Sequence, residues 1–578
     1  MEKLKNLDKI VNLCKGRGFI FQGSEIYGGM GNTWDYGPVG IELKNNVKKA
    51  WWKKFVQESD NSFGVDAAIL MNSRVWDASG HTASFSDPKM DCKNCKTRHR
   101  ADNLIEEYNH KHGIEMPVDS MSKEEMQAYI VEHQIECPNC GKCDFTEIKN
   151  FNLMFSTKRG VTDASQDIIY LRPETAQGEF VNFLNVQRTT RAKVPFGIAQ
   201  IGKAFRNEIT PGNFIFRTIE FEQMEHQFFC KKEDSEKYYN EYKQRAWDFA
   251  VSVGLKPENL RFKDHDKLAH YAAAACDIQY NFPMGFSELN GIHNRTNYDL
   301  SRHQEFSGKS MLYMDPITNE KYVPCDIEYS IGCDRLILAL LCEAYDEEKL
   351  DDGETRVVMR FAPHIAPYKV AILPQPNYKS AEDFRVFGKP RLGFLINSGV
   401  VDSMVNNYSV FKHRRKTDEY APGGKTGKRP DRAVIVYANR AKEAYKDVPV
   451  IIGGLEASLR RLGHYDYWSD KVRRSILLDS KADLLIYGMG ERAIIEIAEA
   501  LDSGIQTRDI TWVRGTCYRA KNLEKPGMED VVLLPSFDEI ANDKKAYAKS
   551  FAVQYGSHDA VSAQVLAEKS CDTVYVVQ

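Results

Sequence analysis

A run of aromatic and charged residues at positions 205–225 constrains the fold of this 578-residue chain more than any other feature. Residues 197–205 have strand character, residues 210–213 form a Thr-Pro-Gly-Asn turn cluster, and the aromatic-rich run 214–229 follows. This order predicts that the two runs pair as an antiparallel hairpin.

The charged side chains of this hairpin predict a nucleotide site. Side chains two residues apart on a strand share a face, so Arg206 and Glu208 are expected to face one ligand. Arg217 and Phe221, four residues apart on the returning run, share a face in the same way. An arginine fork binds phosphate, and a carboxylate can accept a hydrogen bond from an amino group such as that of adenine. The alternative is an ordinary buried hairpin with salt-bridged edges.

Three strings in order resemble the motifs of the class II aminoacyl-tRNA synthetases. The hairpin resembles motif 2, in which Arg-x-Glu at a strand end is followed by Arg-x-x-x-Phe. Residues 36–52, with Pro38 ahead of an amphipathic run, resemble motif 1, the dimer-interface helix and strand. Residues 328–342 resemble motif 3, whose arginine, here Arg335, meets the terminal phosphate of ATP. The resemblance implies an α+β core, an antiparallel sheet flanked by helices.

Four further strings, at 152–155, 171–178, 221–225 and 288–292, resemble the dimeric glycyl-tRNA synthetases over residues 1–374. Glycine has no side chain, so selectivity must come from acidic groups that hold its ammonium and from bulk that excludes larger side chains. The resemblance places Glu174, Glu222, Glu328 and Ser330 in that pocket. The full glycine-binding set that it implies is Arg100, Glu174, Phe221, Glu222, Gln223, Met224, Glu225, Glu328, Ser330 and Gly332.

The resemblance implies that ATP activates glycine, which is then transferred to tRNA(Gly). It assigns the α-phosphate to Arg206 and the terminal phosphate to Arg217 and Arg335, with Glu208 on the adenine amino group. Phe221 is expected to stack on the purine, and Glu288 to lie near a Mg²⁺ ion. The implied ATP-binding set is Arg206, Asn207, Glu208, Phe216, Arg217, Thr218, Ile219, Glu220, Phe221, Glu288, Leu289, Gly332, Cys333, Asp334 and Arg335. His293 and Asn294 depart from the family, which has a small and an acidic residue there.

Thirteen cysteines without a secretory segment indicate reduced thiols in the cytoplasm. Four of them, Cys92, Cys95, Cys137 and Cys140, form two Cys-x-x-Cys knuckles, a spacing that predicts a structural Zn²⁺ site. The alternative is an inserted loop whose cysteines bind no metal. Cys143 is spare under either interpretation.

Beyond position 374 the expected anticodon-binding domain does not continue. Residues 388–392, 402–406, 420–430, 453–461 and 486–491 resemble instead the amino-terminal region of the YgiQ-type radical-SAM proteins. Apolar runs at 434–437, 450–452 and 484–487, with a helical run at 491–501, predict a doubly wound, Rossmann-like parallel sheet. The Cys-x3-Cys-x2-Cys motif of an iron–sulfur cluster does not occur, so radical chemistry is not expected.

These patterns predict three parts. They are a catalytic core at 1–360 with a cysteine-bearing insertion at 86–150, a stub of the anticodon-binding domain at 361–374, and the α/β domain at 375–578. A net charge of −3 gives no global signal for nucleic acid, and the longest apolar stretches are too short to span a bilayer. We therefore expect a cytoplasmic, homodimeric glycine-activating ligase whose tRNA step is impaired. The alternative is a chimeric, non-catalytic protein whose carboxy-terminal α/β unit is a binding module.

Overall fold

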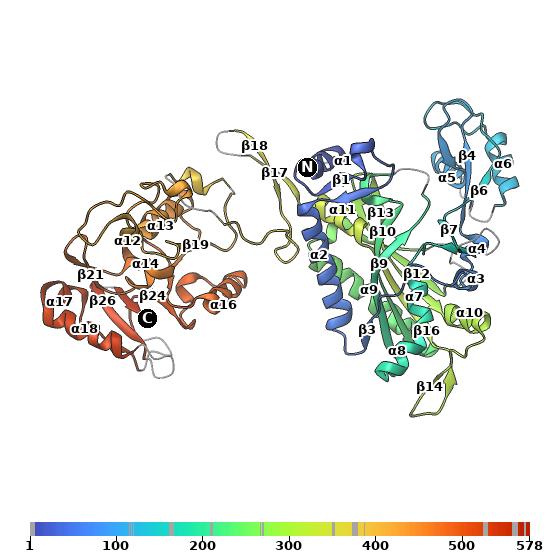
Figure 1. Cartoon of the computed structure of the whole chain (residues 1–578). Coiled ribbons are helices and arrows are strands. Elements are labelled where there is room, and N and C mark those ends of the chain that lie inside the picture. Colours follow the sequence, from blue (N-terminus) through green and yellow to red (C-terminus); the bar gives the residue numbers. More distant parts are fainter. Residues whose placement is uncertain are drawn as a thin grey trace. The chain divides into compact units, whose positions relative to one another are not determined.

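The computed structural model describes residues 6–114, 116, 118, 121–160, 167–208, 212–265, 268, 271–349, 353–372, 380–386, 388–523, 530–557, 564–571 and 574–577. The chain divides into two compact units, Met1–Ala371 and Ile372–Gln578 (Figure 1). The boundary predicted between 374 and 375 falls outside the described residues. Within the described ranges, every helix falls short of the length and apolar character that a membrane span requires.

A seven-stranded sheet forms the centre of the first unit, with strand order β11-β12-β13-β16-β10-β9-β3. Its neighbours pair antiparallel, except β3 and β9, which are parallel. The strands are β11 (Leu260–Asp264), β12 (Ala274–Phe282), β13 (Gly285–Thr296), β16 (Cys325–Gly332), β10 (Glu220–Cys230), β9 (Phe196–Phe205) and β3 (Ser62–Gly64). The predicted hairpin is confirmed, because β9 and β10 pair antiparallel from Phe205↔Glu220 to Phe196↔Phe229. The second strand begins later than expected, since Phe214–Phe216 form a short 3-10 helix.

Opposite faces of this sheet bury two different cores. Met224 and Phe228 of β10 pack with α2 (Pro38–Trp52), α9 (Ser235–Ser252) and α11 (Cys333–Ala344) in the larger core. Phe229 packs on the other face with α7 (Ala176–Val181), α8 (Phe183–Thr190) and α10 (Tyr298–Ser307). Pro38 is the first residue of α2, where its missing N–H costs no hydrogen bond. Along β10, successive side chains therefore alternate between the two faces.

The cysteine-bearing insertion folds as a small three-stranded sheet, of order β5-β4-β6, with two helices. These elements are β4 (Ser86–Asp91), β5 (Arg98–Arg100), β6 (Lys149–Asn152), α5 (Ala101–His112) and α6 (Lys123–Glu132). Met90, Leu104, Ile105 and Ile130 bury a core of their own. The remaining elements of the first unit are α1 (Leu7–Gly16), β1 (Ile20–Gln22), β2 (Trp34–Tyr36), α3 (Arg74–Ala78), α4 (His81–Ser84), β7 (Ser156–Arg159), β8 (Asp167–Tyr170), β14 (Tyr313–Met314), β15 (Lys321–Tyr322), β17 (Tyr345–Lys349) and β18 (Thr355–Met359).

The second unit also contains a seven-stranded sheet, of order β19-β20-β23-β24-β27-β26-β25. Only β19–β20, β20–β23 and β25–β26 are parallel pairs, so the sheet is mixed rather than the parallel sheet expected. Its strands are β19 (Phe394–Asn397), β20 (Val450–Gly453), β23 (Leu484–Ile486), β24 (Thr516–Ala520), β27 (Val574–Val577), β26 (Leu566–Cys571) and β25 (Val532–Leu533). The other elements are α12 (Ser403–Asn407), α13 (Ala433–Ala444), α14 (Gly454–Ser458), β21 (His464–Asp466), β22 (Lys471–Arg473), α15 (Ile476–Asp479), α16 (Glu491–Asp502), α17 (Phe537–Asn542) and α18 (Lys544–Gly556).

One predicted strand of the second unit is wrong. Residues 434–437 belong to helix α13, because the buried residues Ala433, Val434, Tyr437, Ala438 and Ala441 follow a helical period. The strands expected at 450–452 and 484–487 and the helix expected at 491–501 are confirmed as β20, β23 and α16.

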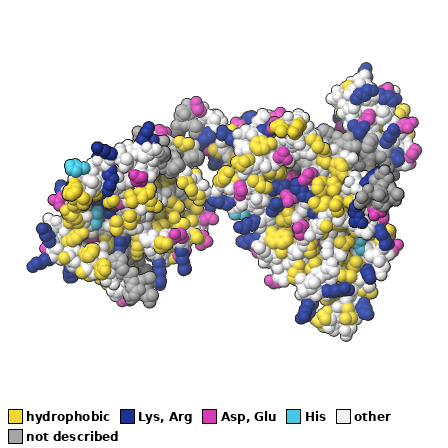
Figure 2. Space-filling model, viewed as in Figure 1, with side chains coloured by type: hydrophobic (Ala, Val, Ile, Leu, Met, Phe, Trp, Pro, Cys, Tyr) yellow, Lys and Arg dark blue, Asp and Glu magenta, His cyan; other side chains and the backbone are white. Residues whose placement is uncertain are grey.

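On the visible face of the first unit, basic and acidic side chains are interspersed (Figure 2). Neither sign of charge dominates this face, in keeping with the net charge of −3.

Candidate active site

A cavity of about 230 Å³ opens over strands β10, β13 and β16 on the sheet face opposite α9. Its walls come from these strands, from the segment that follows β9 and from the start of α11. The lining residues are Glu174, Arg206, Glu208, Ile215, Phe216, Arg217, Thr218, Phe221, Gln223, Glu225, Tyr271, Glu288, Gly291, His293, Arg295, Glu328, Ser330, Gly332, Asp334 and Arg335.

Three arginines line one part of this cavity. Arg206 donates from Nε to the carbonyl oxygen of Pro173 at 3.0 Å, and its guanidinium lies 5.5 Å from the ring centroid of Phe221. Arg335 forms an ion pair of 3.0 Å with Glu288. In the described part of the chain, neither Arg206 nor Arg217 has an ion-pair partner. Both charges are therefore available to an anionic ligand.

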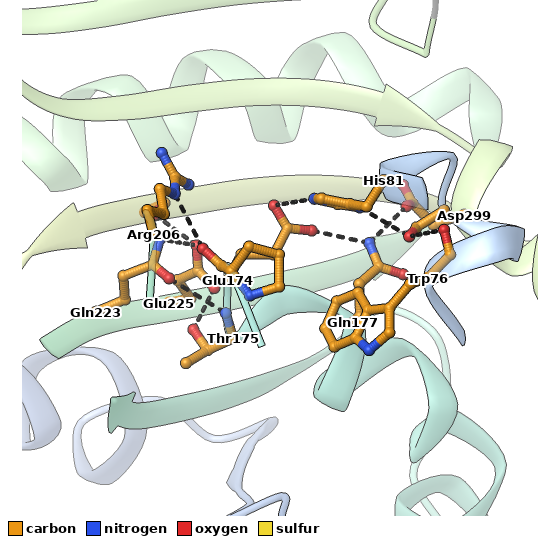
Figure 3. Close-up of polar contacts among 12 residues, drawn as sticks. Trp76, His81, Glu174, Thr175, Gln177, Arg206, Gln223, Glu225 and Asp299 are labelled. Atoms are coloured by element: carbon orange, nitrogen blue, oxygen red, sulfur yellow. Dashed lines mark hydrogen bonds and ion pairs between the residues drawn. The ribbon is translucent and has the colours of Figure 1, made fainter. Parts of the chain in front are cut away.

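Three glutamates also line the cavity, of which Glu225 and Glu328 are buried and Glu174 is half-buried. Glu174 lies between His81, whose Nε2 is 3.5 Å from its carboxylate, and Gln177, whose Nε2 donates to it at 3.0 Å (Figure 3). Glu225 accepts hydrogen bonds from Ser330 at 2.6 Å, from Gln223 at 3.0 Å and from the Thr175 hydroxyl.

Glu328 is held by three neighbours. Arg295 donates from Nη1 to its two carboxylate oxygens at 3.0 and 3.1 Å, and Nδ1 of His293 lies 2.6 Å away. Gln227 donates from Nε2 at 3.2 Å. The same Arg295 pairs with Asp299, so one buried cation balances two buried acids.

The three glutamates differ in protonation because their neighbours differ. Burial raises the pKa of Glu328, but Arg295 and His293 outweigh burial and bring it to about 2. Burial acts on Glu174 in the same way, and His81 and Arg295 hold its pKa well below the usual range. For Glu225, burial and the charges of Glu328 and Glu174 raise the pKa to about 7. Near neutral pH, two of these three glutamates are therefore ionised and the third titrates.

The cavity brings together most of the predicted site residues. Those that line it are Glu174, Arg206, Glu208, Phe216, Arg217, Thr218, Phe221, Gln223, Glu225, Glu288, Glu328, Ser330, Gly332, Asp334 and Arg335. Asp334 is also part of a structural network, since it accepts hydrogen bonds from Tyr36 at 2.5 Å and Lys44 at 3.0 Å.

Two residues predicted to contact glycine lie on the face of the sheet away from the cavity. Glu222 and Met224 alternate with Phe221, Gln223 and Glu225 along β10, and therefore face the α2 side. Glu222 forms ion pairs with Lys44 at 2.9 Å and Lys48 at 3.1 Å, both on α2.

Other predicted contacts also lie outside the cavity lining. Arg100 belongs to the insertion, where it forms a bidentate pair with Asp102. Leu289 and Cys333 are buried in the larger core. Glu220 pairs with Lys203 near the surface, and Asn207 and Ile219 are absent from the lining.

Five lining residues were not predicted as contacts: Ile215, Tyr271, Gly291, His293 and Arg295. Two of them could have been found from strand pairing, because Gly291 pairs with Ser330 and His293 with Glu328. For Arg295 the sequence offers only a weaker indication, because Asp299 follows it by four residues, a spacing at which opposite charges can pair.

The four knuckle cysteines form a separate cluster in the insertion. Their sulfur atoms lie within 4.8 Å of one another, with Cys92–Cys140 and Cys95–Cys137 separations of 3.6 Å. A tetrahedral zinc with Zn–S bonds of ~2.3 Å separates its sulfurs by ~3.8 Å, so the cluster fits this ion. Cys143 lies outside the group and donates to the carbonyl oxygen of Gln134.

Comparison with known proteins gives two family matches. The model of the tRNA synthetase class II core domain (G, H, P, S and T) matches residues 155–344, and that of the radical SAM N-terminal domain matches residues 355–578. These matches agree with the two resemblances that the motifs indicate.

Curated relatives match the first two thirds of the chain. A glycine--tRNA ligase of Caldanaerobacter subterraneus subsp. tengcongensis is 59% identical over 383 residues, 66% of this chain and 83% of the relative. The Clostridium kluyveri enzyme of the same name is 56% identical over 407 residues, 70% of this chain and 88% of the relative. That of Geobacillus kaustophilus is 55% identical over 404 residues, with coverage of 70% and 88%.

Proposed function

The chain belongs to the glycine-tRNA ligase family, and we propose that the cavity of its first unit is where glycine reacts with ATP to form glycyl-adenylate. One observation carries this proposal. Two arginines without an ion-pair partner among the described residues border the same small cavity as three glutamates, two of them buried. Such a site can hold a polyphosphate and an ammonium group side by side.

The arginines orient ATP in this proposal. Arg206 contacts the α-phosphate, while Arg217 and Arg335 contact the terminal phosphate. Glu208 accepts a hydrogen bond from the adenine amino group, and the purine stacks on Phe221. The carboxylate oxygen of glycine attacks the α-phosphorus, the bond to the bridging oxygen breaks, and pyrophosphate leaves with that electron pair. Because the attacking group is already an anion, no general base is required.

The glutamates select the amino acid. The glycine ammonium lies among Glu174, Glu225 and Glu328, while Ser330 fixes the Glu225 carboxylate at 2.6 Å. The large side chain of Tyr271 borders the same cavity and limits the space for an amino acid larger than glycine.

Class II synthetases use Mg²⁺ with ATP, and Glu288 is the residue we assign to it. Its carboxylate borders the cavity, lies 3.0 Å from Nη1 of Arg335 and is about half exposed (51%), which suits an ion that keeps several waters. When bound, Mg²⁺ neutralises charge on the phosphate oxygens.

The second unit differs from an anticodon reader in this proposal. The radical SAM N-terminal match covers 355–578 and includes the predicted stub at 361–374, so we assign the unit from 375 onward another role. Transfer to tRNA(Gly) is then weak, because recognition lacks its distal contact. We further assign a structural Zn²⁺ to Cys92, Cys95, Cys137 and Cys140, a homodimer contact to the α2 region, and a cytoplasmic location that suits the free thiols.

Glycine-dependent exchange of pyrophosphate into ATP by the full chain tests the proposal. Exchange is expected in the wild type and should fall about a hundredfold or more in Arg206→Ala, since a pre-oriented charge contact is lost. The matched control is Arg188→Ala, an exposed arginine of α8 in the same unit, which should exchange normally. A folded wild-type chain without any glycine-dependent exchange would refute the assignment.

A further inference from the structure

Three side chains beside the cavity form a cluster that the adenylation chemistry does not use. His265, Asp277 and His293 each present one donor atom, and these atoms all lie within 4.8 Å of one another. Nε2 of His265 is 2.9 Å from Oδ1 of Asp277, and the two imidazole rings are 5.8 Å apart. Of the three, only His293 lines the cavity, so the cluster lies at its edge.

Strand pairing explains why these residues meet. Asp277 of β12 pairs with Gly291 of β13, and Ala275 pairs with His293, so Asp277 and His293 are diagonal neighbours on one face. His265 follows β11 directly, and its backbone N–H donates to the carbonyl oxygen of Ala275 at 3.0 Å. The three donors thus come from β12, from β13 and from the residue that follows β11.

The two ring nitrogens of His293 have the surroundings that are usual for a metal-bound histidine. Nδ1 lies 2.6 Å from the Glu328 carboxylate, which accepts hydrogen bonds, so in the neutral imidazole Nδ1 carries the proton and Nε2 keeps its lone pair. A carboxylate on the distal nitrogen is the usual partner of a metal-bound histidine. An ideal Cβ on Gly291 would lie 3.2 Å from this Nε2 and 3.6 Å from Oδ1 of Asp277. The glycine therefore leaves room where the two donors converge.

We propose that His265, Asp277 and His293 bind a divalent transition metal ion, separate from the Mg²⁺ of the ATP site and from the cysteine cluster. Two imidazoles and one carboxylate suit Zn²⁺ or Fe²⁺ better than Mg²⁺, which prefers oxygen ligands alone. With metal–ligand bonds of ~2.1 Å, tetrahedral ligands are ~3.4 Å apart, so the donors need only small side-chain rotations. Three protein ligands leave one coordination position for a further oxygen ligand.

Equilibrium dialysis of the chelator-stripped full chain against Zn²⁺ tests this site. The wild type is expected to bind one zinc more per chain than either His265→Gln or Asp277→Asn, since each variant removes one donor. The matched control His413→Gln, an exposed histidine of the second unit, should bind as much as the wild type. Equal zinc content in all four proteins would overturn the proposal.

A crystallographic measurement guards against variants that fail to fold. Crystals of the wild type grown with Zn²⁺ should show an anomalous peak at the zinc edge between these three side chains, in addition to any peak at the cysteines. A peak at the cysteines alone would refute the site, whatever the variants bind.

Discussion

Protonation of Glu225 should control glycine affinity near neutral pH. Three donors, from Ser330, Gln223 and Thr175, stabilise its ionised form. Burial and the neighbouring charges of Glu328 and Glu174 outweigh them and raise its pKa to about 7. Because an ionised Glu225 attracts the glycine ammonium and a protonated one does not, glycine should bind better as the pH rises through this value.

The size of the effect follows from that pKa. With a pKa of about 7, the ionised fraction is ~0.9 at about pH 8 and ~0.1 at about pH 6. If only the ionised form binds glycine productively, kcat/KM for glycine should fall about tenfold over this range, equivalent to ~1.4 kcal/mol. Glu328, with a pKa of about 2, and Glu174, whose pKa lies well below the usual range, stay ionised throughout and contribute no slope.

Pyrophosphate exchange at varied glycine and saturating ATP measures this slope. Glu225→Gln keeps the size of the side chain but removes its titration, so its kcat/KM should be low and nearly independent of pH. His293 is a second titrating group beside the pocket. Burial lowers its pKa, but Glu328 raises it by more, so the net shift is upward. His293→Gln serves as the control and should retain the tenfold fall. A Glu225→Gln variant with the same pH slope as the wild type would refute this reasoning.

Two stability predictions concern other buried charges. Arg295→Met leaves Glu328 and Asp299 buried without their cation, so urea unfolding of the first unit should show a loss of about 3–5 kcal/mol; a loss under ~1 kcal/mol would contradict the pairing. In the second unit, burial raises the pKa of Glu568 from 4.5 to about 7. The stability linked to this proton is fully present below about pH 4.5 and is lost as the pH rises through about 7. From about pH 5 to about pH 8 the wild type should therefore lose ~2–3 kcal/mol relative to Glu568→Gln. Burial lowers the pKa of His464 to about 4, so this histidine adds stability as the pH rises, equally in both proteins. A stability difference between wild type and Glu568→Gln that stays the same from about pH 5 to about pH 8 would contradict the prediction.

Local patterns in the sequence were enough for the elements that carry the motifs. The strand signals on both sides of the turn predicted β9 and β10, and the apolar runs at 450–452 and 484–487 predicted β20 and β23. The apolar run 434–437 was misread because four residues cannot distinguish a buried strand from a helix. The helical period emerges only when Ala438 and Ala441 are included.

Some of the predicted contact residues lie outside the cavity for a different reason. Period-two alternation, applied to Arg206 and Glu208, also separates Glu222 from Gln223 and Glu225. The family resemblance places the whole run 221–225 at the glycine, although alternate side chains of one strand face opposite sides of the sheet. The alternation along the strand is enough to predict which acids face the cavity. It cannot predict the ion-pair partners of Glu222, because Lys44 and Lys48 lie on α2, far away in the sequence.

Arg295 decides which carboxylate of the pocket titrates. It contacts Glu328 directly and lowers the pKa of Glu174 through its charge, so both remain ionised. Glu225 gains no such contact and instead experiences the two anions that Arg295 keeps charged. The arginine therefore acts in opposite directions on neighbouring acids, holding two negative and indirectly favouring the proton on the third. Since this arrangement depends on β13, β16 and β10 lying side by side, spacing along the chain could not have predicted it.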